Sequence, residues 1–328
     1  MELRKDPITR SWVITGDDAP TMPRERDCPY CPEANPAPQV ISSMPAVDGG
    51  PWSARAVVHP APLYRVEGDP QRQANGLYDR MRSVGAHEVL LENRLHDREL
   101  WKASDAEVEQ VLLLAAQRVL DLKQDRRLKY ITVFKDYGEV AGQDISHPSF
   151  QLTGTTFVPR RVLYELRASR EYYQQKERCV FCDILAQEER QVVRMVERRG
   201  EYSALCPYAA RVPYETWLLS RLHDSSFERH VNSKAAGLRD LAALLRRTLN
   251  RIRSVSEGFH LVLHTSPNSL YRSEVLGYWK TIDDDYHWHI EILPIVRGKL
   301  KSYTVKESYF TSITPEAAAA RLREASPE

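Results

Sequence analysis

The chain has 328 residues, which exceeds a typical single core and suits two domains of about 150 residues each. Its formal net charge of +1 excludes the broad positive field typical of proteins that bind nucleic acid or anionic membranes. The sequence has no run of about 20 apolar residues that would span a membrane. Its polar N-terminus is unlike a signal peptide, so we expect a cytoplasmic protein.

In the first half, prolines and other turn formers predict mostly loop over residues 1–50, around a first pair of cysteines. Ser104 is a typical cap for a helix over 104–121, where apolar residues follow the helical period. Short β-branched and apolar runs predict four strands. These lie at 56–58, 88–91, 130–134 and 150–158.

The second half repeats this order of elements. Residues 160–178 are charged and predict a helix that connects the halves. The elements that follow are a strand at 214–219, a helix at 233–254, strands at 259–264 and 287–294, and a terminal helix with the alanine run 317–320. The repeated order predicts an internal duplication, with one half at 1–165 and the other at 166–328.

Four of the five cysteines form two Cys-x-x-Cys pairs, Cys28 with Cys31 and Cys179 with Cys182. Two intervening residues allow both thiolates to bind one metal ion from a tight turn. In a reducing compartment such pairs are metal ligands or redox pairs rather than structural disulfides. A redox pair typically opens a helix after a strand, whereas Cys28 lies in a proline-rich segment. The metal interpretation is therefore favoured.

Histidines supply the two further ligands that each tetrahedral site needs. His96 and His147 are the candidates in the first half, and His223 and His287 are the candidates in the second. A Cys2His2 set favours zinc in a closed structural site. Other histidines compete with His96 and His223 on spacing alone: His59, His87 and His264.

Taken in order, these motifs resemble the galactose-1-phosphate uridylyltransferase family of the histidine-triad superfamily. The resemblance runs nearly the whole chain, through the opening at residues 3–14, Cys-Pro-Tyr-Cys at 28–31, His-Pro-x-x-Gln at 147–151 and His-Trp-His at 287–289. It implies an α+β fold, an internally duplicated histidine-triad-like fold with two antiparallel sheets, helices packed on them, and a central cleft. It also implies two zinc ions per chain. Their ligands would be Cys28, Cys31, His96 and His147 in one site, and Cys179, Cys182, His223 and His287 in the other.

Ser149 stands where the resemblance places the catalytic nucleophile. The family strand reads His-Pro-His-x-Gln, and its second histidine attacks the α-phosphorus of a nucleotide sugar and holds the nucleotidyl group. Imidazole suits both steps near neutral pH, whereas a serine hydroxyl needs a base to attack, and its phosphodiester would be slow to release. We therefore expect no covalent histidine–nucleotidyl intermediate, with Ser149 either catalytic or a small filler.

Other positions of the expected pocket also differ from the family pattern. Asp136 and Asp144 replace neutral groups that donate hydrogen bonds to phosphate, and carboxylates there would repel it. His59 replaces an asparagine of the nucleotide-binding segment, and Lys306 and Glu307 lie where the family has a glycine-rich sugar loop. Because the differences are grouped in the pocket, natural divergence is favoured over a single engineered change.

Strand alternation places Ser149 and Gln151 on one face of their strand, and His289 on one face of another. These three are the candidate catalytic residues. The candidate substrate-binding residues are Asp136, Asp144, His59, His260, Lys306 and Glu307.

The favoured function is a divergent enzyme that acts on a nucleotide sugar or sugar phosphate without a covalent histidine intermediate. One alternative is a non-catalytic ligand-binding homologue. Another is an intact nucleotidyltransferase or phosphorylase that uses a different nucleophile, for which His289 is a candidate. The expected partner is a small-molecule substrate rather than nucleic acid or a membrane, and a homodimer is compatible with this interpretation.

Overall fold

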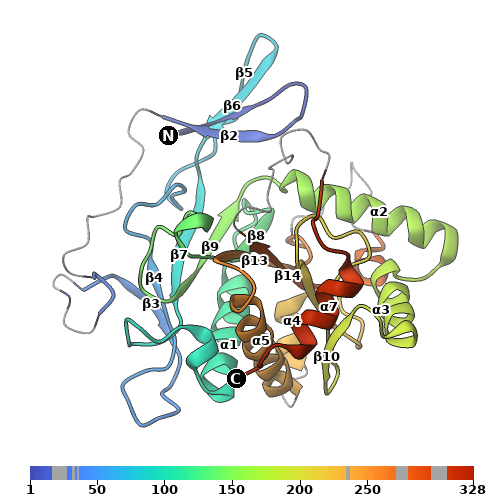
Figure 1. Cartoon of the computed structure of the whole chain (residues 1–328). Coiled ribbons are helices and arrows are strands. Elements are labelled where there is room, and N and C mark those ends of the chain that lie inside the picture. The colour runs from blue at the N-terminus through green and yellow to red at the C-terminus, as the bar shows by residue number, and fades with distance from the viewer. Residues whose placement is uncertain (17–27, 32–33, 35–36, 234–236, 271–279, 297–308) are drawn as a thin grey trace.

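A computed structural model of the chain describes residues 1–16, 28–31, 34, 37–233, 237–270, 280–296 and 309–328. The described residues form a four-stranded and a ten-stranded antiparallel sheet, with helices packed against the larger one (Figure 1). The expected α+β class with two antiparallel sheets is confirmed.

The small sheet was not predicted, and two of its strands lie within residues 1–50, which were expected to be mostly loop. It consists of β2 (Trp12–Thr15), β1 (Glu2–Lys5), β6 (Tyr78–Arg82) and β5 (Gln73–Asn75), in that order. These strands are short and rich in charge, so their period of two rests on single buried side chains such as Leu3 and Met81. Turn formers dominate the local composition and conceal that signal.

The ten-stranded sheet is built from five strands of each half. The first half supplies β3 (Val40–Ser43), β4 (Arg55–Val58), β7 (Gly85–Leu91), β9 (Ser149–Thr155) and β8 (Tyr130–Tyr137), from the edge inward. The second supplies β10 (Met195–Arg199), β11 (Tyr202–Leu205), β12 (Thr216–Ser220), β14 (His289–Ile295) and β13 (Gly258–His264) in the same sense. The halves meet edge to edge, because β8 pairs with β13 instead of facing it across a cleft.

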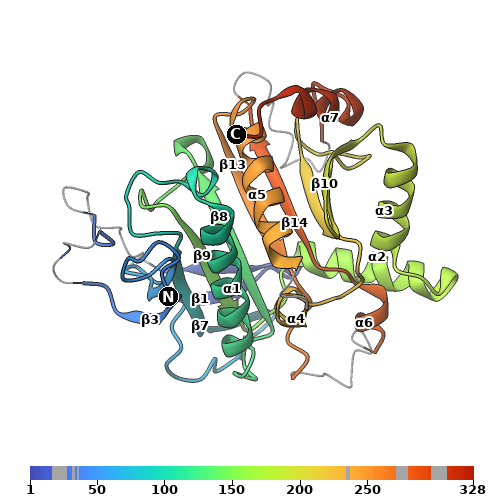
Figure 2. The same cartoon turned by 90° about the horizontal axis from the view of Figure 1, so that it is seen from below.

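One face of this sheet is apolar and covered by helices (Figure 2). α1 (Asp105–Leu122) and α5 (Leu238–Arg253) pack side by side on it, with α4 (Phe227–Ser233) beside α1. As predicted, Ser104 caps α1, and Glu107 completes a capping box. The helix predicted at 233–254 corresponds to α5, whereas α4 ends where that range begins and was not predicted, and 234–236 lie outside the described residues.

The opposite face of the sheet carries the polar side chains. Over the second half, α2 (Arg160–Lys176) and α3 (Val180–Gln191) cover it and bury a separate apolar cluster. Over the first half it carries a smaller cluster around Tyr30 and Trp52, and its polar groups stay partly exposed. Strand alternation thus sends the polar residues of β8, β9, β13 and β14 to a common surface.

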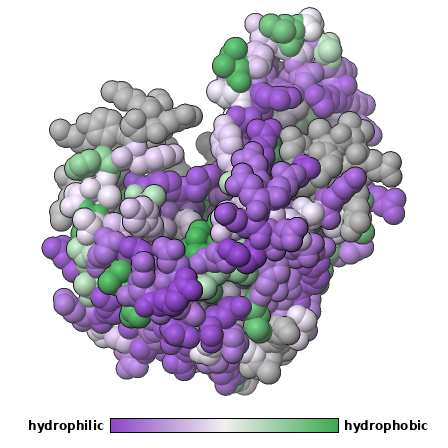
Figure 3. Space-filling model, turned by 90° about the vertical axis from the view of Figure 1, so that its right-hand side faces the viewer, coloured by the Kyte–Doolittle hydropathy of each residue, from purple (hydrophilic) through white to green (hydrophobic). Residues whose placement is uncertain are grey.

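The remaining described helices are short. η1 (Leu100–Lys102) and η2 (Glu139–Ala141) precede α1 and β9, α6 (Ile282–Asp285) precedes β14, and α7 (Pro315–Glu324) contains the alanine run. In the view of Figure 3 the surface is mostly hydrophilic, with scattered hydrophobic residues. Among the described residues, we find no helix with the length and apolar character needed to cross a membrane.

Candidate active site and metal centres

The first candidate metal-ligand cluster consists of Cys28, Cys31, His96 and His147, whose potential ligand atoms all lie within 4.8 Å of one another. The Sγ atom of Cys28 is 3.6 Å from His147 Nδ1, and that of Cys31 is 3.5 Å from His96 Nδ1. With zinc–sulfur and zinc–nitrogen bonds of about 2.3 and 2.0 Å, a tetrahedral site separates sulfur from nitrogen by about 3.5 Å. The donor set and its spacing therefore fit zinc.

The second cluster repeats this arrangement with Cys179, Cys182, His223 and His287. Cys182 Sγ lies 3.3 Å from His223 Nδ1 and 3.5 Å from His287 Nδ1. In both clusters a histidine Nε2 reaches a backbone carbonyl oxygen at 2.9 Å, that of Asn93 from His147 and that of Asp283 from His223. Such an outer hydrogen bond leaves Nδ1 for the metal and orients the ring.

The ligands lie at corresponding places in the two halves. His96 follows β7, and His223 follows β12 in the same way. His147 lies two residues before the start of β9, and His287 lies two residues before the start of β14. These strands are adjacent, since β7 pairs with β9 and β12 pairs with β14. Adjacent strand ends thus bring the histidines to one point, and the cysteine pairs complete each set.

Ser149 and Gln151 lie on the polar face of β9, at the centre of the first half. Ser149 is 9% exposed, and its hydroxyl donates a hydrogen bond of 2.9 Å to the backbone carbonyl of His147. Gln151 extends from the next position on the same face. Its amide Nε2 donates to Asp144 Oδ1 at 2.6 Å.

Two stacked histidines lie beside Gln151, with ring centroids 3.9 Å apart and planes inclined by 10°. The Nδ1 atom of His59 accepts the backbone N–H of Ala61, and that of His87 accepts the N–H of Leu63. Each neutral ring therefore carries its proton on Nε2. Burial and the neighbouring His87 lower the pKa of His59 to about 4, and burial lowers the pKa of His87, so both rings are neutral at pH 7.

Hydrogen bonds run in one direction from His87 to Asp144. His87 Nε2 lies 3.0 Å from Gln151 Oε1, and Gln151 Nε2 donates onward to the carboxylate. The Nε2 of His59 faces the other carboxylate oxygen at 4.0 Å, beyond hydrogen-bond range. The Asp144 carboxylate thus faces two neutral donors, the amide of Gln151 and, at longer range, the imidazole of His59.

Two buried donors at this site have no hydrogen-bond partner among the described residues, His59 Nε2 and Tyr30 Oη. His59 is 3% exposed and Tyr30 is similarly buried. Burial, followed by the charges of Asp144 and Cys28, holds the pKa of Tyr30 well above its usual range, so its hydroxyl keeps the proton. Buried polar groups normally have partners, so these two donors are available to a water molecule or to a ligand oxygen atom.

Asp136 and His260 form a pair on the same face. His260 Nδ1 lies 2.6 Å from Asp136 Oδ1, and the two residues are direct cross-strand partners on β8 and β13. The side chain of Asp136 is 26% exposed and that of His260 is 41% exposed. Solvent and ligands therefore reach this pair.

His289 lies elsewhere, in a buried cluster of the second half. Its ring stacks on His264 at 4.5 Å and on Phe181 at 4.9 Å. His264 contacts Glu165 of α2 at 3.1 Å and Glu291 at 3.6 Å. Burial alone would lower the pKa of His264, but these two carboxylates raise it to about 9. Burial and the charge of His264 lower the pKa of His289 to about 4.

Of the predicted substrate-binding residues, the structure gathers four around β8 and β9. These are His59, Asp136, Asp144 and His260. Lys306 and Glu307 lie outside the described residues. Sequence reasoning missed Tyr30 as a site residue, although its place between two metal-ligand cysteines was visible, and it treated His87 only as a competing ligand.

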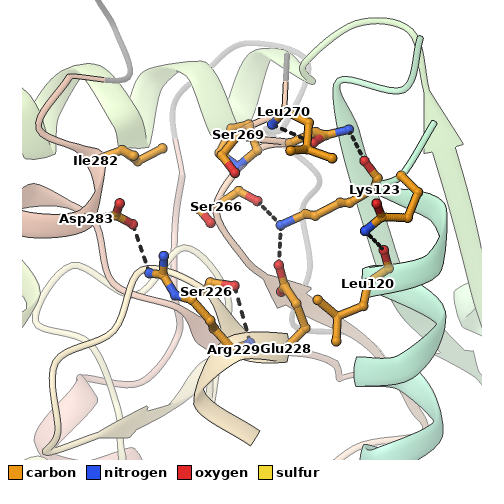
Figure 4. Close-up of a pocket in the computed structure, with 13 residues that line it drawn as sticks. Leu120, Lys123, Ser226, Glu228, Arg229, Ser266, Ser269, Leu270, Ile282 and Asp283 are labelled. Atoms are coloured by element: carbon orange, nitrogen blue, oxygen red, sulfur yellow. Dashed lines mark hydrogen bonds and ion pairs between the residues drawn. The ribbon is translucent and has the colours of Figure 1, made fainter. Parts of the chain in front are cut away.

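A separate pocket of about 240 Å³ lies between the end of α1, the start of α4 and the loop after β13 (Figure 4). Lys123 points into it, bonded to Glu228 and, at 2.7 Å, to the carbonyl oxygen of Ser266. Arg229 is paired with Asp283 on its other side. These ion pairs satisfy the charges, and the candidate site residues lie outside this pocket.

Comparisons with known proteins bear on this geometry. No family model matches the chain. An ADP-glucose phosphorylase of Arabidopsis thaliana is 26% identical over 99% of this chain and 93% of its own length. A galactose-1-phosphate uridylyltransferase of Thermotoga maritima is 25% identical over 100% of this chain and 99% of its own. A solved uridylyltransferase structure matches with a TM-score of 0.82 and 25% identity, over 99% of this chain and 98% of that one.

Proposed function

We infer that this chain, which belongs to the galactose-1-phosphate uridylyltransferase family, acts on a nucleotide sugar or sugar phosphate by direct displacement, without a covalent histidine–nucleotidyl intermediate. Ser149 is the observation that carries this proposal. It lies between His147 and Gln151, and its hydroxyl donates to a backbone carbonyl instead of a base. A serine without a neighbouring base is a poor nucleophile for phosphorus.

Neutral donors of the site would hold the substrate. Tyr30 Oη and His59 Nε2 are buried and keep their protons, so both suit phosphoryl or sugar oxygen atoms. Asp144 accepts from Gln151, which draws part of its charge away from the ligand. Preorganised donors in a buried site are worth more than the same donors in water.

A different histidine nucleophile is the second candidate, because His59 and His87 lie close to Gln151. The lone pair of each ring is on Nδ1, where a backbone N–H already occupies it. His289 is enclosed between His264 and Phe181, so we give it a structural role. These observations favour direct displacement over transfer through another imidazole.

We also propose zinc in both Cys2His2 clusters, with Cys28, Cys31, His96 and His147 in one and Cys179, Cys182, His223 and His287 in the other. The donor spacing supports this assignment. All four ligands of each set are protein side chains, which is typical of a structural ion. Zinc would cross-link each cysteine segment to the strand ends beside the polar face of the ten-stranded sheet.

We further propose that residues 1–165 and 166–328 are the two halves of a duplication. The strand order supports it, since β3, β4, β7, β9 and β8 correspond in sequence order and position to β10, β11, β12, β14 and β13. Phe134 and Val262 pair with each other at the junction, and they pair with Gln151 and Glu291, respectively, on their other sides. In this correspondence Ser149 matches His289.

The test is to incubate the purified protein with UDP-glucose, ADP-glucose and a GDP-sugar. Binding should raise the thermal midpoint by mass action, products should form, and intact mass should show no nucleotidyl adduct. Tyr30→Phe should weaken binding by about tenfold, since it removes one unsatisfied donor. The matched control Tyr164→Phe, on the exposed face of α2, should bind like the wild type. A covalent adduct or ping-pong kinetics would contradict direct displacement.

A further inference from the structure

We propose that the Asp136 carboxylate, held in place by His260, deprotonates a water molecule that attacks the α-phosphorus of a nucleotide sugar. This inference rests on the proposed function and adds to it an acceptor and a base. The reaction would be hydrolysis, with a nucleoside monophosphate and a sugar 1-phosphate as products.

Position comes from the strand register. The paired register of β8 and β9 ends at Phe134 and Gln151, and extending it by two residues places Asp136 across from Ser149. Both side chains are on the polar face, because strand alternation gives Asp136 the side of Phe134 and Ser149 the side of Gln151. The second half supports this register, since His264 and His289 are direct partners at the corresponding positions.

Orientation comes from His260. Its Nδ1 lies 2.6 Å from Asp136 Oδ1, and the cross-strand pairing of the two residues fixes that contact. The imidazole N–H therefore occupies one carboxylate oxygen and leaves the lone pairs of the other available for a water molecule. His260 touches Asp136 and not the reacting atoms, so it is a positioning residue.

The charge of the site selects the acceptor. Phosphate or a sugar phosphate would add a second anion beside the bound nucleotide sugar, and Asp136 and Asp144 oppose that further charge. Such acceptors also need no base, because they are already ionised at neutral pH. Water is neutral and needs a base to attack. Ser149 does not compete with water for this role, because its hydroxyl donates to the backbone carbonyl of His147.

Each step has a defined path for atoms and protons. The water oxygen forms a bond to the α-phosphorus, and its proton passes to Asp136. The bond from that phosphorus to the bridging oxygen breaks, and the sugar 1-phosphate leaves as an anion without needing protonation. His260 Nδ1–H remains bonded to the protonated carboxyl group, which then releases its proton to solvent.

The experiment compares variants on the nucleotide sugar that the wild type turns over. Asp136→Asn should lower kcat by about 100-fold or more with little change in KM, since a general base contributes typically 10²–10⁴-fold. His260→Gln should lower kcat less. Formate should restore part of the turnover of Asp136→Ala, a rescue that a merely structural role would not give. Asp79→Asn, a carboxylate of the small sheet, is the matched control.

Oxygen-18 water identifies the acceptor independently. The label should appear in the nucleoside monophosphate. Label in the sugar 1-phosphate, or turnover that incorporates none, would overturn the proposal. If Asp136 only repels phosphate, Asp136→Asn would instead increase turnover and tighten binding, which would also overturn it. Binding without turnover by the wild type would refute hydrolysis but retain the ligand class, whereas absence of both would refute the proposed function as well.

Discussion

Ser149 is small, and the carbonyl oxygen of His147 already accepts its hydroxyl proton. We therefore expect Ser149→Ala to keep turnover within about fivefold, since one satisfied neutral hydrogen bond is worth about 1 kcal/mol. Steady-state kinetics would check this. A loss of several hundredfold would show that the hydroxyl takes part in the chemistry.

Ser149→His tests whether the missing imidazole alone explains the altered chemistry. We expect little nucleotidyl adduct, because Asp136 and Asp144 still oppose the phosphate charge. Intact mass after incubation with UDP-glucose and ADP-glucose measures the adduct. Stoichiometric labelling would show that position 149 is the decisive difference and that the carboxylates are tolerated.

The contact between α2 and the second half of the sheet depends on a buried charge cluster. Glu165 of α2 lies 3.1 Å from His264, which also faces Glu291. The positive imidazole holds the pKa of Glu165 at about 2 against the effect of burial. His264→Gln should therefore cost about 3 kcal/mol, because it removes one counter-charge from two buried carboxylates, which keep Arg161 and Arg211 as positive partners. Arg178→Gln, which removes an exposed ion pair with Asp183, should cost less than about 1 kcal/mol.

The same cluster predicts a pH dependence. The pKa of His264 is raised to about 9 from its ordinary 6.5. Its contribution to stability is therefore complete below about pH 6.5 and is lost as the pH rises through 9. Denaturant unfolding at pH 6.5, 8 and 9.5 should show this decline in the wild type and a flatter profile in His264→Gln. An equal decline of the unfolding free energy in both proteins would show that groups other than His264 cause the pH dependence.

The elements predicted from sequence were those with long, regular patterns. The helix capped by Ser104 and the strands around His147 and His287 have enough apolar residues to reveal their period. The small sheet was missed because its strands are only three to five residues long and several of those residues are charged. The Asp136–His260 pair was not predictable, since it depends on β8 pairing with β13 from the other half.

At the scale of the whole molecule, zinc in the two Cys2His2 clusters would hold together segments that are distant in sequence. Cys28 and His147 are 119 residues apart, and Cys182 and His287 are 105 apart. We expect two zinc ions per chain by elemental analysis, falling to one in Cys28→Ser or in Cys179→Ser, with a lower thermal midpoint in each. Cys206→Ala, a buried cysteine outside both clusters, should keep both ions. A metal-free protein of unchanged stability would contradict this assignment.

The junction between β8 and β13 has a consequence for the halves as separate polypeptides. Within the first half, β8 is the innermost strand of the sheet, and within the second half β13 is. The edge that each would leave free in its own half is hydrogen-bonded by the other. A fragment of residues 1–165 would therefore present the bare backbone of β8, which templates association with any compatible strand. Because β8 and β13 run antiparallel, two copies of one fragment related by a twofold axis would satisfy both edges. A split gene encoding either half would thus yield self-pairing dimers with a continuous sheet, or aggregates, in place of monomers.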